Sequence, residues 1–279
     1  MFTFGADPEI FVKKNGVPVS AHGLVSGTKQ SPLATATGAV QVDGMALEFN
    51  INPSPARDFD LFNLNIVTTI RDLRQMVPGY SFNLSPVQEF SEEYLAAQPD
   101  EAKELGCDPD FNAYTGLANP RPDGTRNFRT GAGHVHIGWG ADIPIENAEH
   151  FEICSSFVKM LDVTVGFFMT YIDRDPRRRE LYGSAGAFRP KSYGVEYRTP
   201  SNVWLTNKDR RRMMWSMMNL AITAKRNGFS AEKATGLTEQ QIVDIINNGD
   251  YETACHILDT KFCLYGLTWI EIKKSMFAK

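Results

Sequence analysis

The stretch GAGHVHIGW, residues 131–139, alternates polar and apolar side chains as a half-buried β-strand does. Side chains two positions apart in a strand point to the same face of the sheet, so His134 and His136 share one face. Val135 and Ile137 share the other face. We expect the apolar face to pack beneath helices and the imidazole face to line a functional surface.

Three more segments with strand character carry polar groups spaced by one residue. These groups are Asp7 and Glu9, then Glu48, Asn50 and Asn52, and finally Glu196 and Arg198. Any one such pair is more often a solvated strand face or a surface salt bridge than a site. Four coincident pairs favour one concave surface that bears carboxylates, imidazoles and a guanidinium.

The rest of the chain predicts helices between widely spaced strands. Apolar residues recur at helical spacing over residues 56–77 and 146–171, and the pattern is helical from residue 207, with breaks near Gly228, Gly249 and Gly266. Residues 85–129 are rich in polar residues, proline and glycine, which predicts a long irregular insertion, and residues 181–190 predict a glycine-rich loop. Together these patterns indicate a mixed sheet-plus-helix protein.

Composition restricts the classes of partner. The chain has 279 residues, 42% of them hydrophobic, which is enough for a substantial core. A net charge of -4 predicts no general attraction to nucleic acid or to an anionic membrane. The four cysteines form no CxxC pair, and no signal peptide is evident, so we expect reduced thiols in a cytoplasmic protein. The longest apolar run, near residues 163–169, is too short to span a bilayer.

The carboxylates on the predicted polar face suggest cation binding, because crowded like charges raise one another's pKa and destabilise the fold. Oxygen ligands together with one histidine suit magnesium or manganese better than zinc. Several such ions imply a polyphosphate, and arginines on the same surface fit that interpretation, since a guanidinium binds phosphate oxygens in a bidentate manner.

Four motifs taken in order resemble the glutamine synthetase and glutamate–cysteine ligase superfamily. They are GADPE at residues 5–9, Asp43-Gly44 followed by Glu48, GAGHVH at residues 131–136, and EYR at residues 196–198. Within the superfamily, the chain is most similar to the phage carboxylate–amine ligases of the COOH.NH2 ligase type 2 group. Residues 182–191 and 196–204 carry much of that similarity, which covers roughly residues 1–205.

The resemblance implies an α+β fold, in which a curved, mainly antiparallel sheet like that of the glutamine synthetase catalytic domain has helices packed on one face. We expect one catalytic domain over residues 1–279, with a sheet core in residues 1–205 and a helical part in residues 206–279. The sheet would form one wall of a funnel for ATP, with Mg²⁺ or Mn²⁺ as the metal cofactor. The residues implied as metal ligands are Asp7, Glu9, Asp43, Glu48, His134 and Glu196. Of these, Asp7 departs from the glutamate that often occupies its position in the family.

The resemblance also implies roles for basic residues. Arg198 and Arg189 would clamp phosphate and act in catalysis with Asp43, which lies near the transferred phosphate. Lys191 and His136 would join both arginines in binding the nucleotide. We also expect three residues to bind substrate, namely Arg126, Arg129 and Tyr182. Asn112 and Tyr114 could line an acceptor pocket, although a surface-loop role is favoured for each.

The function implied is that of an ATP-dependent ligase that forms an amide through an acyl phosphate, with a small-molecule or peptide carboxylate and an amine as substrates. A guanidino kinase shares the sheet of this superfamily, but the His-x-His element favours the ligase. A metal-dependent hydrolase or oxygenase using His134 and His136 stays open as an alternative. So does a non-catalytic phage protein that keeps the fold. A phage-encoded ligase would act in the host cytoplasm.

Overall fold

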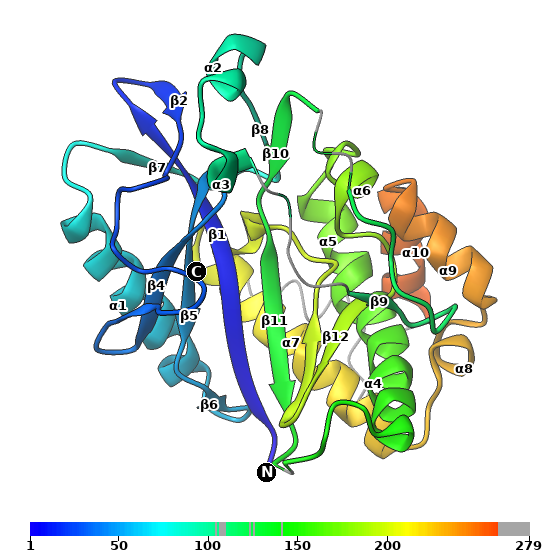
Figure 1. Ribbon diagram of the computed structural model, residues 1–279. Coiled ribbons are helices and arrows are strands. Elements are labelled where there is room, and N and C mark those ends of the chain that lie inside the picture. Colours follow the sequence, from blue (N-terminus) through cyan, green and yellow to red (C-terminus); the bar gives the residue numbers. More distant parts are fainter. Residues whose placement is uncertain (104, 106–109, 123, 125, 141, 262–279) are drawn as a thin grey trace.

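The first strand, β1 (Thr3–Lys14), is the centre of the molecule, because it pairs antiparallel with five other strands. In this computed structural model the described residues are 1–279 except 104, 106–109, 123, 125, 141 and 262–279. The main path of the large sheet runs β3-β4-β5-β1-β11-β13-β12-β9, and β2, β6 and β7 also pair with β1. Figure 1 shows β1 and β11 side by side across the middle of the molecule.

The other strands are short and widely spaced along the chain. They are β2 (Val17–Val19), β3 (Leu33–Ala34), β4 (Gly38–Asp43), β5 (Ala46–Ile51), β6 (Ser54–Pro55), β7 (Ser81–Asn83), β8 (Val87–Glu89), β9 (Phe111–Asn112), β10 (Phe128–Thr130), β11 (Gly133–Gly138), β12 (Ala187–Lys191) and β13 (Gly194–Tyr197). Strands β8 and β10 form a separate two-stranded ribbon. A hairpin joins β1 to β2, and its turn has positive φ angles at Asn15 (52°) and Gly16 (82°).

Helices lie between the widely spaced strands and follow the last of them along the chain. They are α1 (Phe59–Met76), α2 (Glu92–Ala96), α3 (Asp100–Lys103), α4 (Ala148–Leu161), η1 (Asp162–Gly166), α5 (Phe167–Ile172), α6 (Arg178–Leu181), η2 (Asn202–Leu205), α7 (Lys208–Arg226), α8 (Ala231–Thr235), α9 (Glu239–Asn247) and α10 (Tyr251–Thr260). In Figure 1, α7 lies behind the central strands, α1 flanks them on one side and α4 on the other. The predicted α+β class, with a large, mainly antiparallel sheet and helices, is confirmed. The likeness to the glutamine synthetase domain and the single catalytic domain stay predictions.

The core forms where alternate strand residues meet amphipathic helices. The Phe4 ring of β1 packs edge-on against Phe62 of α1 at 6.4 Å between centroids, and Phe62 stacks on Trp204 at 6.2 Å. The Trp204 indole N–H donates to the Gly133 carbonyl at 2.9 Å, which fastens η2 beneath β11. A Cβ at Gly133 would collide with the Ser201 backbone and this indole, so glycine is required at that point of the GAGH motif.

The predicted long helix over residues 146–171 is observed as one continuous run, Ala148–Ile172, composed of α4, η1 and α5. By length and composition this run could cross a membrane, but 83% of its most apolar window is buried inside the protein. Such burial is typical of the core helix of a globular protein. The π-helical turn η1 widens the helix and places Asp162 inside the core, where it is fully buried.

Two expectations about loops need correction. The insertion of residues 85–129 is not irregular throughout, because β8, α2, α3, β9 and β10 lie within it. Apolar side chains of α2 and α3 pack locally around Met45 and Phe90, whereas Phe111 of β9 packs against the main core. The glycine-rich loop is shorter than predicted, since β12 already begins at Ala187. The break predicted near Gly266 lies outside the described residues, as do two of the four cysteines, while Cys154 is a buried free thiol.

Candidate active site

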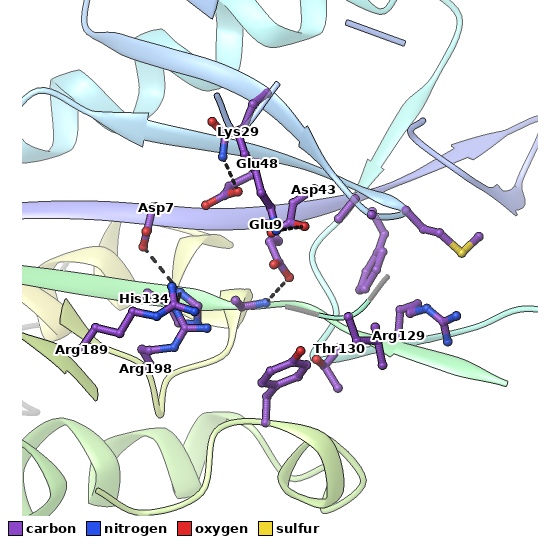
Figure 2. A pocket seen from close by; sticks show the side chains of 18 of the residues that line it. Asp7, Glu9, Lys29, Asp43, Glu48, Arg129, Thr130, His134, Arg189 and Arg198 are labelled. Carbon is purple, nitrogen blue, oxygen red and sulfur yellow. Dashed lines mark hydrogen bonds and ion pairs between the residues drawn. The ribbon is translucent and has the colours of Figure 1, made fainter. Parts of the chain in front are cut away.

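Four of the five acidic residues predicted as metal ligands, all except Glu196, line one cavity of about 310 Å³, which we call the central cavity. Asp7 of β1 is paired with His134 of β11, and Glu9 of β1 is paired with Glu48 of β5. The charged and histidine residues that line the central cavity are Asp7, Glu9, Lys29, Asp43, Glu48, Arg129, His134, Arg189, Lys191 and Arg198. Figure 2 shows the acidic side chains on one side of β11 and Arg189 and Arg198 on the other.

Glu9 and Glu48 lie directly opposite each other on neighbouring antiparallel strands, an arrangement that destabilises a sheet when both are charged. Burial and the nearby Asp43 raise the pKa of Glu9 from 4.5 to about 7. Burial and the carboxylates of Asp7, Asp43 and Glu9 raise the pKa of Glu48 well above its ordinary value. This side of the cavity therefore has an excess of negative charge that a cation would relieve.

Neutral donors and one lysine orient these carboxylates. The backbone N–H of Ala132 donates to Glu9 Oε2 at 2.9 Å, and the Gln41 amide donates to Glu48 Oε2 at 2.7 Å. Lys29 forms an ion pair with Asp43 at 2.7 Å, between Nζ and Oδ1. The sequence motifs identify neither Gln41 nor Lys29. Gln41 could have been found from its alternation with Asp43 along β4, whereas Lys29 lies in a segment without strand character.

Glu196 of β13 lies in the opposite electrostatic environment, although it is fully buried. Its carboxylate is bonded to the Arg198 guanidinium and lies 2.8 Å from Lys191 Nζ and 3.7 Å from Arg189 Nη1. Burial alone would raise the pKa of Glu196, but Arg198 and the histidines outweigh it, so the pKa lies well below its ordinary value. Glu196 is therefore an anion whose charge the protein itself neutralises.

The two histidines differ in their surroundings. The pKa of His134 is well below 6.5 because the ring is buried and Arg198 is close, with Arg198 Nη1 at 3.4 Å from Nδ1. Burial also acts against a charge on His136, but Asp7, whose Oδ1 is 3.0 Å from Nε2, raises the pKa of His136. The other ring nitrogen, Nδ1, is 2.6 Å from the hydroxyl of Tyr193, a contact that sequence motifs do not predict.

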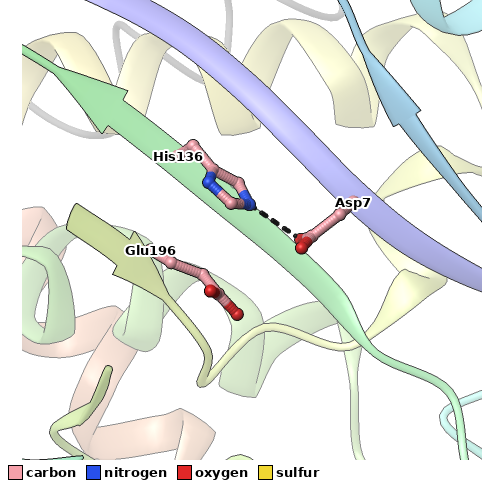
Figure 3. A group of neighbouring side chains, drawn as sticks. All are labelled: Asp7, His136 and Glu196. Atoms are coloured by element: carbon pink, nitrogen blue, oxygen red, sulfur yellow. Dashed lines mark ion pairs between the residues drawn. The ribbon is translucent and has the colours of Figure 1, made fainter. Parts of the chain in front are cut away.

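One three-residue group has the geometry of a metal site. Ligand atoms of Asp7, His136 and Glu196 all lie within 4.8 Å of one another, and Figure 3 shows their side chains converging from β1, β11 and β13. His136 was expected to bind nucleotide rather than metal, and His134, an expected ligand, is not in this group. His134 instead turns Nδ1 toward Glu196 and Asp7 at 3.5 and 3.6 Å.

A segment of the chain that includes β11, β12 and β13 matches a known family. Residues 124–244 match the phage phiEco32-like COOH.NH2 ligase-type 2 family. This finding confirms the resemblance to that group over the matched residues, and the family indicates an enzyme that joins a carboxylate to an amine. The comparison with curated proteins found no match.

The match to the ligase family includes the basic half of the central cavity. The matched segment contains four residues that line the central cavity, His134, Arg189, Lys191 and Arg198, and also Glu196. The acidic residues of β1, β4 and β5 lie outside the matched segment. They join the ligase-family residues through the pairing of β1 with β11.

The three residues expected to bind substrate lie in different places in this ligase-family segment. Arg129 and Tyr182 line the central cavity, but Arg126 does not, and it forms an ion pair with Glu180 at 3.4 Å. Arg129 is 5% exposed and donates to the carbonyls of Arg126 and Phe128, at 2.8 and 2.9 Å. Tyr182 is therefore the best placed of the three to meet a ligand.

The residues weighed for an acceptor pocket have structural contacts instead. The Tyr114 hydroxyl donates to Asp162 at 2.9 Å, and the Tyr197 hydroxyl donates to the same carboxylate at 2.6 Å. Asn112 accepts from the Tyr114 backbone N–H at 2.9 Å. Burial raises the pKa of Asp162 to about 7. This network fastens β13, which carries Glu196, to the long helix from the side away from the central cavity.

Proposed function

We propose that the chain is an ATP-dependent carboxylate–amine ligase that works through an acyl phosphate, with magnesium or manganese as its metal. The observation that carries the proposal is the division of one cavity into a carboxylate side with raised pKa values and a side with three cationic groups around Glu196. Metal ions and phosphate oxygens have opposite requirements, and this cavity meets both.

The donor set fits a hard divalent cation. Carboxylate oxygens of Glu9, Glu48 and Asp43 would hold it, with Asp7 at the boundary between the two sides of the cavity. Glu196 fits a metal ion less well, because Lys191 and Arg198 already neutralise its charge. When bound, the metal would supply positive charge to the phosphate oxygens of the nucleotide.

Transfer of the γ-phosphoryl group requires positioning and charge neutralisation. In the first step a carboxylate oxygen of the substrate bonds to the γ-phosphorus while the bond to ADP breaks. Arg189, Lys191 and Arg198 would bind the oxygens of the moving phosphoryl group, since their guanidinium and ammonium groups face the cavity. In the second step an amine nitrogen bonds to the acyl carbon, phosphate departs, and the proton lost from nitrogen can pass to that phosphate.

The hydrolase alternative needs both histidines and a carboxylate around one metal ion. Among the described residues, the group with three converging ligand atoms contains His136 but not His134. His134 has an arginine beside it, which disfavours a metal ion at that ring nitrogen. The site geometry therefore favours the ligase.

Thermal unfolding with added ligands tests the proposal. Mg²⁺ together with ATP should raise the melting temperature, because a ligand that binds only the native state stabilises it by mass action. Glu48→Gln should abolish both this shift and the release of ADP in a screen of carboxylates and amines. Glu146→Gln, at an exposed turn residue before α4, is the matched control and should behave as the wild type does. A large shift with Zn²⁺ and none with ATP would instead support the hydrolase.

A further inference from the structure

A second cavity of about 230 Å³ adjoins the central cavity, and we call it the side cavity. It is lined by residues from the loop before β12, from α6 and from the insertion, including Asp110, Arg121, Arg179, Glu180, Tyr182 and Arg198. Tyr182 and Arg198 line both cavities. A single water molecule needs only about 10–15 Å³ by the same measure, so the side cavity has room for a small organic molecule.

Arg198 connects the two cavities chemically. Its Nη1 is bonded to Glu196, on the central side, and its Nε donates to Asp110 Oδ2 at 3.0 Å, on the other side. The Tyr182 hydroxyl is buried and has no hydrogen-bond partner among the described residues. A ligand in the side cavity would therefore meet one guanidinium and one unused hydroxyl donor at the junction with the central cavity.

The outer part of the side cavity also has a positive character. Arg179 donates to the backbone carbonyls of Asp173 and Asp175, at 3.4 and 3.5 Å, and the carboxylates of both aspartates also act on its guanidinium electrostatically. Arg121 is exposed at the rim. Two acidic residues, Glu180 and Asp110, line the same cavity; Glu180 is paired with Arg126 at 3.4 Å and Asp110 with Arg198 at 3.0 Å.

We infer that the side cavity binds the substrate whose carboxylate is activated, and that this substrate is a small acid with an anionic group at each end. One carboxylate is held at Tyr182 and Arg198, at the edge of the central cavity, and the other group binds near Arg121 and Arg179. Guanidinium groups suit carboxylates because they donate two parallel hydrogen bonds. The inference rests on the proposed function, which places the nucleotide in the central cavity.

Glutarate is a suitable probe, because it has a carboxylate at each end, and its diamide and 1,5-diaminopentane are matched neutral and cationic controls. Binding is measured by calorimetry with Mg²⁺ and a non-hydrolysable ATP analogue present, so that the probe cannot occupy the central cavity. We expect glutarate to bind and both controls to fail. Arg121→Gln should weaken glutarate binding tenfold or more, while Arg57→Gln, at an exposed arginine before α1, should leave it unchanged.

The outcomes separate this inference from the proposed function. If the nucleotide analogue binds but glutarate does not, or if Arg121→Gln leaves glutarate binding unchanged, the assignment of the side cavity is wrong and the ligase proposal stands. Binding of 1,5-diaminopentane instead of glutarate would also overturn the assignment, because the side cavity would then take the amine. If the nucleotide analogue fails to bind, the proposed function fails, and glutarate binding measured without nucleotide then decides the side cavity alone.

Discussion

Replacing Glu9 by glutamine should stabilise the metal-free protein at alkaline pH, although it alters a central residue of the site. The amide keeps the shape of the side chain, and its oxygen can still accept from the Ala132 N–H. What disappears is a negative charge that faces Glu48 across the strand pair and lies near Asp43. The substitution therefore removes repulsion without opening a cavity.

The magnitude follows from the pKa. Folding raises the pKa of Glu9 from 4.5 to about 7, so the folded state holds the proton more tightly than the unfolded chain does. Stability that depends on this proton is present below pH 4.5 and is lost as the pH rises toward 7. One pKa unit corresponds to about 1.4 kcal/mol, so the ionised side chain destabilises the fold above pH 7 by about 3 kcal/mol. In a chain of this size, that difference is roughly 6–9 °C in melting temperature.

The assay is thermal unfolding of the wild type and Glu9→Gln between pH 4 and 8.5, with a chelator and then with Mg²⁺. The two melting temperatures should be closest near pH 4 and separate as the pH rises from 4.5 to 7, with the variant higher. Added Mg²⁺ should then raise the wild type more than the variant. Glu146→Gln should follow the wild type at every pH. Parallel profiles for wild type and Glu9→Gln, or a variant that is less stable at pH 8, would refute an uncompensated charge at Glu9.

Three other substitutions address the rest of the site. Gly183→Ala should lower the free energy of unfolding by at least about 2 kcal/mol more than Gly228→Ala does, as measured by urea unfolding. Both glycines have φ near +75°, but only at Gly183 would a Cβ collide with a buried guanidinium. Tyr193→Phe should weaken Mn²⁺ binding much less than Glu48→Gln does in a titration, because Tyr193 orients His136, which lies outside the carboxylates proposed to hold the metal. Glu196→Gln should lower stability by about 3 kcal/mol at pH 7, since Arg198 then keeps only Asp110 as its anion and Lys191 loses its contact with the buried carboxylate.

Each of these has a result that contradicts it. Equal losses at the two glycine positions would mean that the loop moves aside from the guanidinium. If Tyr193→Phe weakens Mn²⁺ binding as much as Glu48→Gln does, His136 belongs to the metal site and the assignment to the carboxylates alone is wrong. If Glu196→Gln is as stable as the wild type, the cations around residue 196 must be solvated by water, although the Glu196 carboxylate itself is fully buried.

The polar strand pairs were predictable, because side-chain alternation depends only on the local chain. The sequence placed Asp7, Glu9 and Glu48 on strands and on the polar face, and the register confirms that placement. It could not predict Lys29 or Tyr193, whose positions depend on how segments without alternation fold back onto the sheet. Lys29 reaches Asp43 from such a segment, before β3.

Tyr114 shows a different reason for failure. Its residue type and its place in the insertion favour a surface loop over a pocket. The structure instead directs its hydroxyl into the interior, to Asp162. That carboxylate belongs to the first residue of the π-helical turn η1, and a helical sequence pattern does not reveal a π turn. A contact to a residue in a π-helical turn can therefore be identified from the three-dimensional structure but not from the sequence pattern.

The difference in surrounding charge between Glu9 and Glu48 on one side and Glu196 on the other is visible in the structure but not in the sequence. Sequence motifs treat Glu9, Glu48 and Glu196 as equivalent metal ligands. Their surroundings differ, since other carboxylates surround Glu48, whereas arginine, lysine and histidine surround Glu196. A divalent cation gains most where carboxylates are uncompensated, so Glu9 and Glu48 should dominate its affinity. A phosphate group that approaches Glu196 would compete with its carboxylate for Arg198. If Arg198 leaves Glu196 to bind phosphate, the negative charge of Glu196 is exposed, and phosphate binding is then coupled to cation binding on the acidic side of the cavity.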